Sequence, residues 1–147
     1  MKWIDLPPVW LALFVALGWV QAERFPFGSF GGVGDWLGAL LVAAGLALAV
    51  AAAVELRRAR TTIVPHGTPS AIVTSGVYRL SRNPIYLGDA LILAGLGLRW
   101  DSVLALVLVP VFVAVITARF IRPEEARLRA RFAAEFDAWA ARVRRWA

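Results

Sequence analysis

The fold is decided by the stretch Asp35–Arg60, which reads DWLGALLVAAGLALAVAAAVELRRAR. From Leu37 to Val54 every residue is Ala, Leu, Val or Gly, and a helix needs about 20 apolar residues to cross a bilayer. The apolar run ends at Glu55 and is followed at once by arginines, as at a membrane surface. We therefore predict a transmembrane helix over residues 35–56, with a Gly and Ala face suited to close helix packing or to a homodimer.

The composition agrees with a membrane protein. Of the 147 residues, 60% are hydrophobic and 18% are charged, and the mean hydropathy is +0.68. A soluble domain has about 45–50% apolar and about 25% charged residues, so this chain has too little polar surface to cover a globule in water. The length allows one domain, residues 1–147. High hydrophobicity excludes a disordered chain, and the absence of Cys excludes a disulfide framework.

Further apolar runs predict helices over residues 6–22, 85–98 and 102–121. Pro7 and Pro8 suit the first turn of a helix, where a missing N–H costs nothing. The Gly- and Phe-rich residues 21–34 are expected to form an interfacial loop, and residues 57–84 a polar cytoplasmic loop. The connection at residues 99–102 is so short that the last two helices must form an antiparallel hairpin.

The tail, residues 123–146, differs from the rest of the chain. Its apolar residues recur at spacings of three and four among charged residues; they are Leu128, Phe132, Phe136, Trp139 and Val143. This periodicity predicts an amphipathic helix that starts at Pro123 and is too charged to cross a bilayer. The predicted fold class is thus all-α: an integral membrane protein with four transmembrane helices and a C-terminal amphipathic cytoplasmic helix.

The basic residues give the topology. Five Lys or Arg residues lie in the 57–84 loop and eight from Arg119 onward, whereas the opposite side holds only Arg24 and Arg99. Because basic loops stay in the cytoplasm, we expect both termini to be cytoplasmic, in what we take to be a bacterial inner membrane. The net charge of +6 is split into blocks between apolar runs, which argues against a nucleic-acid-binding face.

Several ionisable residues lie at the predicted membrane edge, where lipid makes a charge costly and hence of functional interest. Asp89 is one turn into an apolar helix, and the pair Glu124–Glu125 follows the last span. Acids in the first turn of a helix are favoured by its dipole, so the pair has a structural explanation. The alternative is that one carboxylate, Glu125 in our prediction, faces a cytoplasmic pocket. With one His and no Cys, we predict no metal site.

The stretch Val73–Gly88 reads VTSGVYRLSRNPIYLG. It resembles the signature of the isoprenylcysteine carboxyl methyltransferases and the related phospholipid methyltransferases, which have Gly-x-Tyr, then Arg-His-Pro-x-Tyr, and later Glu-Glu. The matching positions are Gly76, Tyr78, Arg82, Pro84, Tyr86, Gly88, Glu124, Glu125, Leu128 and Phe132. The resemblance covers residues 61–146. Asn83 stands where the carboxyl methyltransferases usually have His.

This resemblance implies methyl transfer from S-adenosylmethionine to a lipophilic acceptor that is dissolved among the membrane lipids. The acceptor would be a small molecule or a lipidated substrate. It implies catalytic roles for Arg82 and Glu125, with Arg82 pairing with the methionine carboxylate of the cofactor. Tyrosine rings would face the sulfonium, and a Glu would accept from the ribose hydroxyls or the ammonium group. The implied cofactor-binding residues are Tyr78, Arg82, Asn83, Pro84, Tyr86, Leu87, Gly88, Glu124, Glu125 and His66.

Two other functions are alternatives at this point. Tyr86-Leu-Gly-Asp89 resembles a Tyr-x-Gly-Asp motif of membrane sterol reductases, which are much longer and bind NADPH. The third hypothesis is a non-enzymatic membrane subunit with an altered pocket, since Asn83 and the tail depart from the methyltransferase pattern. A motif match alone does not decide between these hypotheses.

Overall fold

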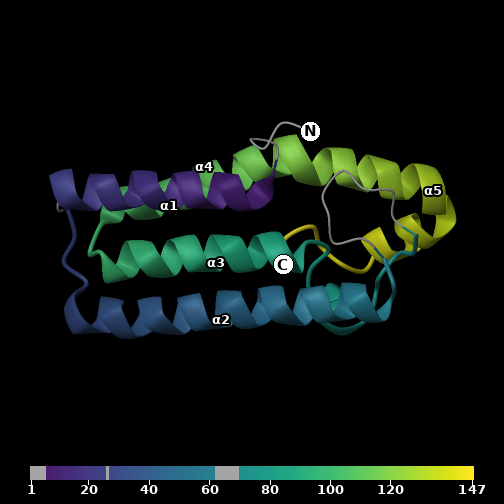
Figure 1. The fold of residues 1–147 in the computed structure, drawn as a ribbon, viewed down its shortest axis with the longest axis horizontal. Helices are drawn as coiled ribbons and strands as arrows, with labels where there is room; N and C mark the ends of the chain where they lie inside the picture. Colours follow the sequence, from purple (N-terminus) through teal and green to yellow (C-terminus); the bar gives the residue numbers. More distant parts are fainter. Residues whose placement is uncertain (1–5, 26, 62–69) are drawn as a thin grey trace.

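The computed structural model describes residues 6–25, 27–61 and 70–147, and over these residues it contains helices and no strands (Figure 1). The elements, in chain order, are α1 (Pro7–Arg24), α2 (Gly31–Arg58), the 3-10 turn η2 (Gly76–Arg79), α3 (Pro84–Arg99), α4 (Val103–Ile116), the π-helical turn η3 (Thr117–Ile121) and α5 (Arg122–Ala140). The predicted all-helical class is confirmed for this part of the chain.

Helix α3 lies at the centre of the bundle, between α2 on one side and α1 and α4 on the other (Figure 1). Its contact with α2 depends on glycines. A Cβ on Gly88 would lie 2.6 Å from the Gly45 carbonyl oxygen, and one on Gly95 would lie 2.6 Å from the Gly38 carbonyl oxygen. The predicted small-residue face of α2 therefore packs within the chain, backbone against backbone.

The other side of α3 faces the main apolar core. Leu93 of α3 is fully buried, as is Phe112 of α4, and the Phe112 ring meets the Phe14 ring of α1 edge-on at 5.3 Å between centroids. Two helices begin at residues that favour a helix start. Helix α3 begins at Pro84, and the Ser102 hydroxyl caps α4 by accepting from the Ala105 N–H at 3.2 Å.

Two helical stretches among the described residues are long and apolar enough to cross a membrane: α2, and Val103–Ala140, which comprises α4, η3 and α5. Only 17% of the most apolar window of α2 is buried, and the large exposed side chains on α2 include Trp36, Leu40 and Val50. A core helix of a soluble protein would bury this surface. Helix α3 has 16 residues, or about 24 Å, so four crossing helices stay a prediction.

The interfacial loop predicted over residues 21–34 is wrong at both ends. Helix α1 continues to Arg24 and α2 begins at Gly31, four residues before the predicted start. Of the glycines in the first turn, Gly34 continues the contact face of the helix: a Cβ on Gly34 would lie 3.1 Å from the Leu98 carbonyl oxygen of α3. Tertiary packing here outweighs the low helix propensity of glycine.

The tail also differs from the prediction. No separate helix starts at Pro123, since α4 runs through η3 into α5 without a break before Phe132. The ring of Pro123 would crowd the carbonyl four residues earlier, and the wider π-helical turn just before it relieves that crowding. The helix ends at Ala140 instead of residue 146, after a kink at Phe132 (φ −127°, ψ 39°). The chain then turns back to the start of α3 (Figure 1).

Candidate active site

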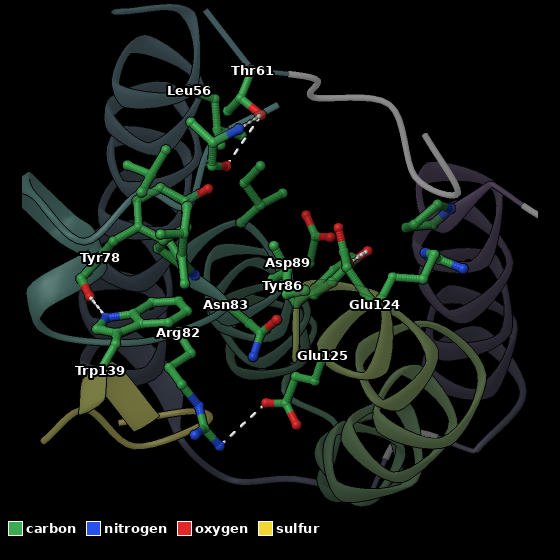
Figure 2. A pocket seen from close by; sticks show the side chains of 18 of the residues that line it. Leu56, Thr61, Tyr78, Arg82, Asn83, Tyr86, Asp89, Glu124, Glu125 and Trp139 are labelled. Carbon is green, nitrogen blue, oxygen red and sulfur yellow. Dashed lines mark hydrogen bonds and ion pairs between the residues drawn. The ribbon is translucent and has the colours of Figure 1, made fainter. Parts of the chain in front are cut away.

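A cavity of about 270 Å³ lies at the end of the bundle where α2 ends and α1, α3 and α5 begin (Figure 2). Its lining divides by chemistry. The wall from α1 is apolar and consists of Pro7, Pro8 and Leu11. The opposite walls carry the charged and aromatic side chains, which come from η2, the start of α3 and the inner side of α5.

The segment before α3 holds the polar wall in place. Ser81 is fully buried, and its hydroxyl accepts from the Asn83 backbone N–H at 3.1 Å, which fixes the turn. Pro84 is the first residue of α3 and pre-sets the helical backbone angle. The first turns of α3 then present Tyr86 and Asp89 to the cavity, three positions apart and therefore on one helix face.

A cluster of three charged side chains closes one side of the cavity. Arg82 Nη2 lies 3.2 Å from Glu125 Oε1 (Figure 2). Arg145, beyond the end of α5, donates to both oxygens of the same carboxylate, with Nε at 3.1 and 3.2 Å and Nη2 at 2.7 Å from Oε2. Hydrogen bonding to Glu125 raises the pKa of Arg145. Two guanidiniums sharing one carboxylate leave the cluster with net positive charge.

Glu124 faces a different partner from its neighbour. Its Oε2 accepts from the Tyr86 hydroxyl at 3.4 Å, across the cavity from the charged cluster (Figure 2). Successive residues on a helix point about 100° apart, so Glu124 and Glu125 reach different walls while both line the cavity. The two acids thus have different partners, and which of them binds a ligand stays a prediction.

An aromatic wall completes the site. Trp139 of α5 donates from Nε1 to the Tyr78 carbonyl oxygen at 3.1 Å, and the two rings lie 6.5 Å apart between centroids (Figure 2). Trp139 also meets Phe136 edge-on at 6.0 Å. Burial, with the nearby Glu124 and Glu55 carboxylates, raises the pKa of Tyr78, so its hydroxyl stays protonated.

The structure brings most of the predicted site residues together. The cavity is lined by Tyr78, Arg82, Asn83, Pro84, Tyr86, Glu124 and Glu125. Leu87 and Gly88 do not line it: they lie on the other faces of α3, and Gly88 faces α2. Asn83 lines the cavity, but its amide Nδ2 donates to the Arg145 carbonyl oxygen at 2.9 Å. His66 lies outside the described residues.

Sequence reasoning did not assign two parts of the site. The spacing of the tail placed Trp139 on the apolar face of a helix, but it gave no sign that this face covers η2. The Arg145 pair with Glu125 joins residues 20 positions apart, which no helical periodicity predicts. Within the described ranges, no three His, Cys, Asp or Glu side chains gather as a metal ion would require.

In a comparison with protein families, the model described as phospholipid methyltransferase matches residues 33–135. This range contains nearly all of α2, the whole of α3 and α4, and α5 as far as residue 135. Comparisons with curated proteins and with solved structures gave no match. Because the family model covers well over half of the chain, and covers most of the polar wall of the cavity, the chain belongs to the phospholipid methyltransferase family, a family of membrane methyltransferases.

Proposed function

We propose that this protein transfers a methyl group from S-adenosylmethionine to a lipophilic acceptor that is dissolved in the membrane. One observation carries the proposal: a single cavity joins a cationic cluster, an aromatic wall and an apolar wall from α1. The family supplies the reaction class. The cofactor and the acceptor class are our inference from the side chains that line the cavity.

The side chains present suit the cofactor. In the part of the chain that the structure describes, the buried Nε of Arg82 has no acceptor, and a buried donor without a partner is costly. A carboxylate such as that of the methionine end would accept from it. The positive charge of the Arg82, Glu125 and Arg145 cluster favours an anion at this point.

The rest of the polar wall suits the other end of the cofactor. Tyr86 and Glu124 form a hydroxyl–carboxylate pair that would bind hydroxyl or ammonium groups. Tyr78 and Trp139 offer aromatic faces, which attract a cation such as a sulfonium. When bound, S-adenosylmethionine supplies a methyl group already activated by sulfonium. The protein then acts chiefly by holding and orienting the two reactants.

The apolar wall indicates the class of acceptor. Pro7, Pro8 and Leu11 of α1, with Leu56 of α2, would bind a hydrocarbon chain next to the polar wall. A carboxylate or thiolate acceptor has no proton to lose. An amine acceptor must be neutral to react, and Glu124 is placed within the cavity to take its proton.

We further propose four membrane crossings by α1–α4, with both termini and the cavity on the cytoplasmic side of a bacterial inner membrane, and with α5 an amphipathic helix at that surface. The basic residues support this arrangement, because they gather at the cavity end of the bundle and beyond it. Membrane lipids would surround the exposed apolar side chains of α2. A homodimer through the remaining outer face of α2 is compatible with this arrangement.

The decisive experiment is a thermal shift of the purified protein in detergent. S-adenosylhomocysteine should raise the melting temperature, by the equivalent of about 2.7 kcal/mol at 100 times its dissociation constant, and NADPH should leave it unchanged. The family match gives the reductase hypothesis no support. Stabilisation by NADPH alone would overturn the proposal, and stabilisation by neither ligand would favour a non-enzymatic subunit.

The acceptor is identified by transfer of a labelled methyl group. The protein is incubated with labelled S-adenosylmethionine and a lipid extract of the native membrane, and the products are separated by mass spectrometry. A labelled lipophilic product is expected with the parent protein. The matched control is Arg82→Ala, which should label far less lipid than the parent at the same cofactor concentration. Label found only in water-soluble products would refute the lipophilic acceptor.

A further inference from the structure

The last residues, 141–147, form a segment that we call the C-terminal strap. After α5 ends, the strap crosses the turn that precedes α3. The Arg144 carbonyl oxygen accepts from the Arg82 backbone N–H at 2.9 Å. The Arg145 carbonyl oxygen accepts from Asn83 Nδ2 at 2.9 Å and from the Ser81 hydroxyl at 3.3 Å. The strap thus holds the backbone that carries Arg82.

The end of the strap is anchored in the bundle. Trp146 donates from Nε1 to the Thr117 hydroxyl at 3.1 Å, at the first residue of the π-helical turn, and its ring packs against the main core. Between these anchors the Arg145 side chain reaches Glu125. The strap lies outside the range matched by the family model, which ends at residue 135.

We propose that Arg145 is a positioning residue: it holds the Glu125 carboxylate and thereby keeps Arg82 able to bind the carboxylate of the cofactor. This inference rests on the proposed function. Arg145 touches neither the cavity nor, in our proposal, the cofactor, and acts only through Glu125.

The geometry shows why Arg82 needs such a partner. Glu125 gives only Oε1 to Arg82, at 3.2 Å, because Arg145 forks across both of its oxygens. Arg82 therefore keeps its buried Nε without an acceptor in the described chain. Without Arg145, the carboxylate could turn fully onto Arg82 and form a two-bond pair, which is the favoured geometry of guanidinium and carboxylate. That pair would have no net charge and so would not attract the carboxylate of the cofactor.

The test compares binding of two ligands to the full-length protein in detergent by calorimetry. The ligands are S-adenosylhomocysteine and its decarboxylated analogue, which lacks only the carboxylate. Arg145→Gln should weaken S-adenosylhomocysteine by about tenfold, as expected for loss of a hydrogen bond to a charged group, and should leave the analogue unchanged. Arg145→Lys keeps the charge but cannot form the two-bond fork with Glu125, so its affinity should lie between that of Arg145→Gln and that of the parent.

The matched control is Arg144→Gln, which removes the same charge from the adjacent, exposed side chain and should bind like the parent. Equal losses at the two positions would reduce the effect to long-range charge and overturn the inference. So would a loss for both ligands, which indicates a disordered pocket, or an unchanged affinity in Arg145→Gln. A parent that binds neither ligand overturns the proposed function, and this inference with it.

Discussion

The charged cluster makes Glu125→Gln the most informative single substitution for stability. The change leaves Arg82 and Arg145 facing each other without their shared carboxylate. Breaking a buried pair by removing one partner costs about 3–5 kcal/mol, whereas an exposed pair contributes about 0–1 kcal/mol. The side chains of Arg82 and Glu125 are 13% and 14% exposed and that of Arg145 is 36% exposed. We therefore expect a loss of about 2–4 kcal/mol, below the fully buried limit.

The assay is unfolding of the ligand-free protein in detergent, by heat or by denaturant. The matched control is Asp137→Asn, which makes the same chemical change in the Arg129–Asp137 pair. That pair has a similar contact distance of 2.8 Å, but its side chains are 61% and 58% exposed, so the control should lose at most about 1 kcal/mol.

A third variant isolates the cause of the loss. In Glu125→Gln combined with Arg145→Gln, one of the two uncompensated charges is gone, so part of the lost stability should return. The burial reasoning is refuted if Glu125→Gln loses no more stability than Asp137→Asn. It is also refuted if the stability loss of the double variant equals the sum of the losses of its two single variants, because the cluster then does not act as one unit.

Three further predictions follow from the same geometry. Arg82→Ala should weaken S-adenosylhomocysteine by about 1.5–3 kcal/mol in calorimetry; unchanged affinity in a folded protein would make Arg82 structural only. A reporter active in the cytoplasm should give signal when fused after Trp146 and none when inserted at Ser29, and signal at Ser29 would contradict the proposed topology. Gly88→Val should lower the melting temperature by separating α2 from α3, whereas Gly32→Ala, where a Cβ meets nothing within 4 Å, should not.

The helices were predictable because their signals are local. Pro7 and Pro84 each occupy the first turn of a helix, where proline is favoured. The short 99–102 connection gave the hairpin of α3 and α4. The start of α2 was not predictable from the same rules. Gly31 and Gly34 read locally as loop residues. Gly31 opens the helix with a positive φ of 53°, which glycine adopts readily, and Gly34 lies where the backbone of α3 comes close.

The site residues could be predicted where their side chains belong to a sequence motif. The contacts that involve backbone atoms could not. Arg82, Tyr86 and Glu125 were all expected in the cavity and all line it. The fold of the strap could not be expected, because three of its hydrogen bonds are accepted by the carbonyl oxygens of Arg144 and Arg145. Carbonyl oxygens are the same in every residue and leave no mark in a sequence.

The adjacent acids Glu124 and Glu125 have different partners because of the turn that precedes them. The π-helical turn η3 ends immediately before α5, and its extra residue changes the direction in which the side chains that follow it point from the helix. At that rotation Glu125 lies between two guanidiniums, whereas Glu124 lies beside Tyr86. A carboxylate already shared by two cations has little capacity left for an ammonium or hydroxyl group of a ligand. In the proposed site, Glu125 would therefore adjust the charge of Arg82, and Glu124, in place of the Glu125 that we predicted from the sequence, would contact the ligand.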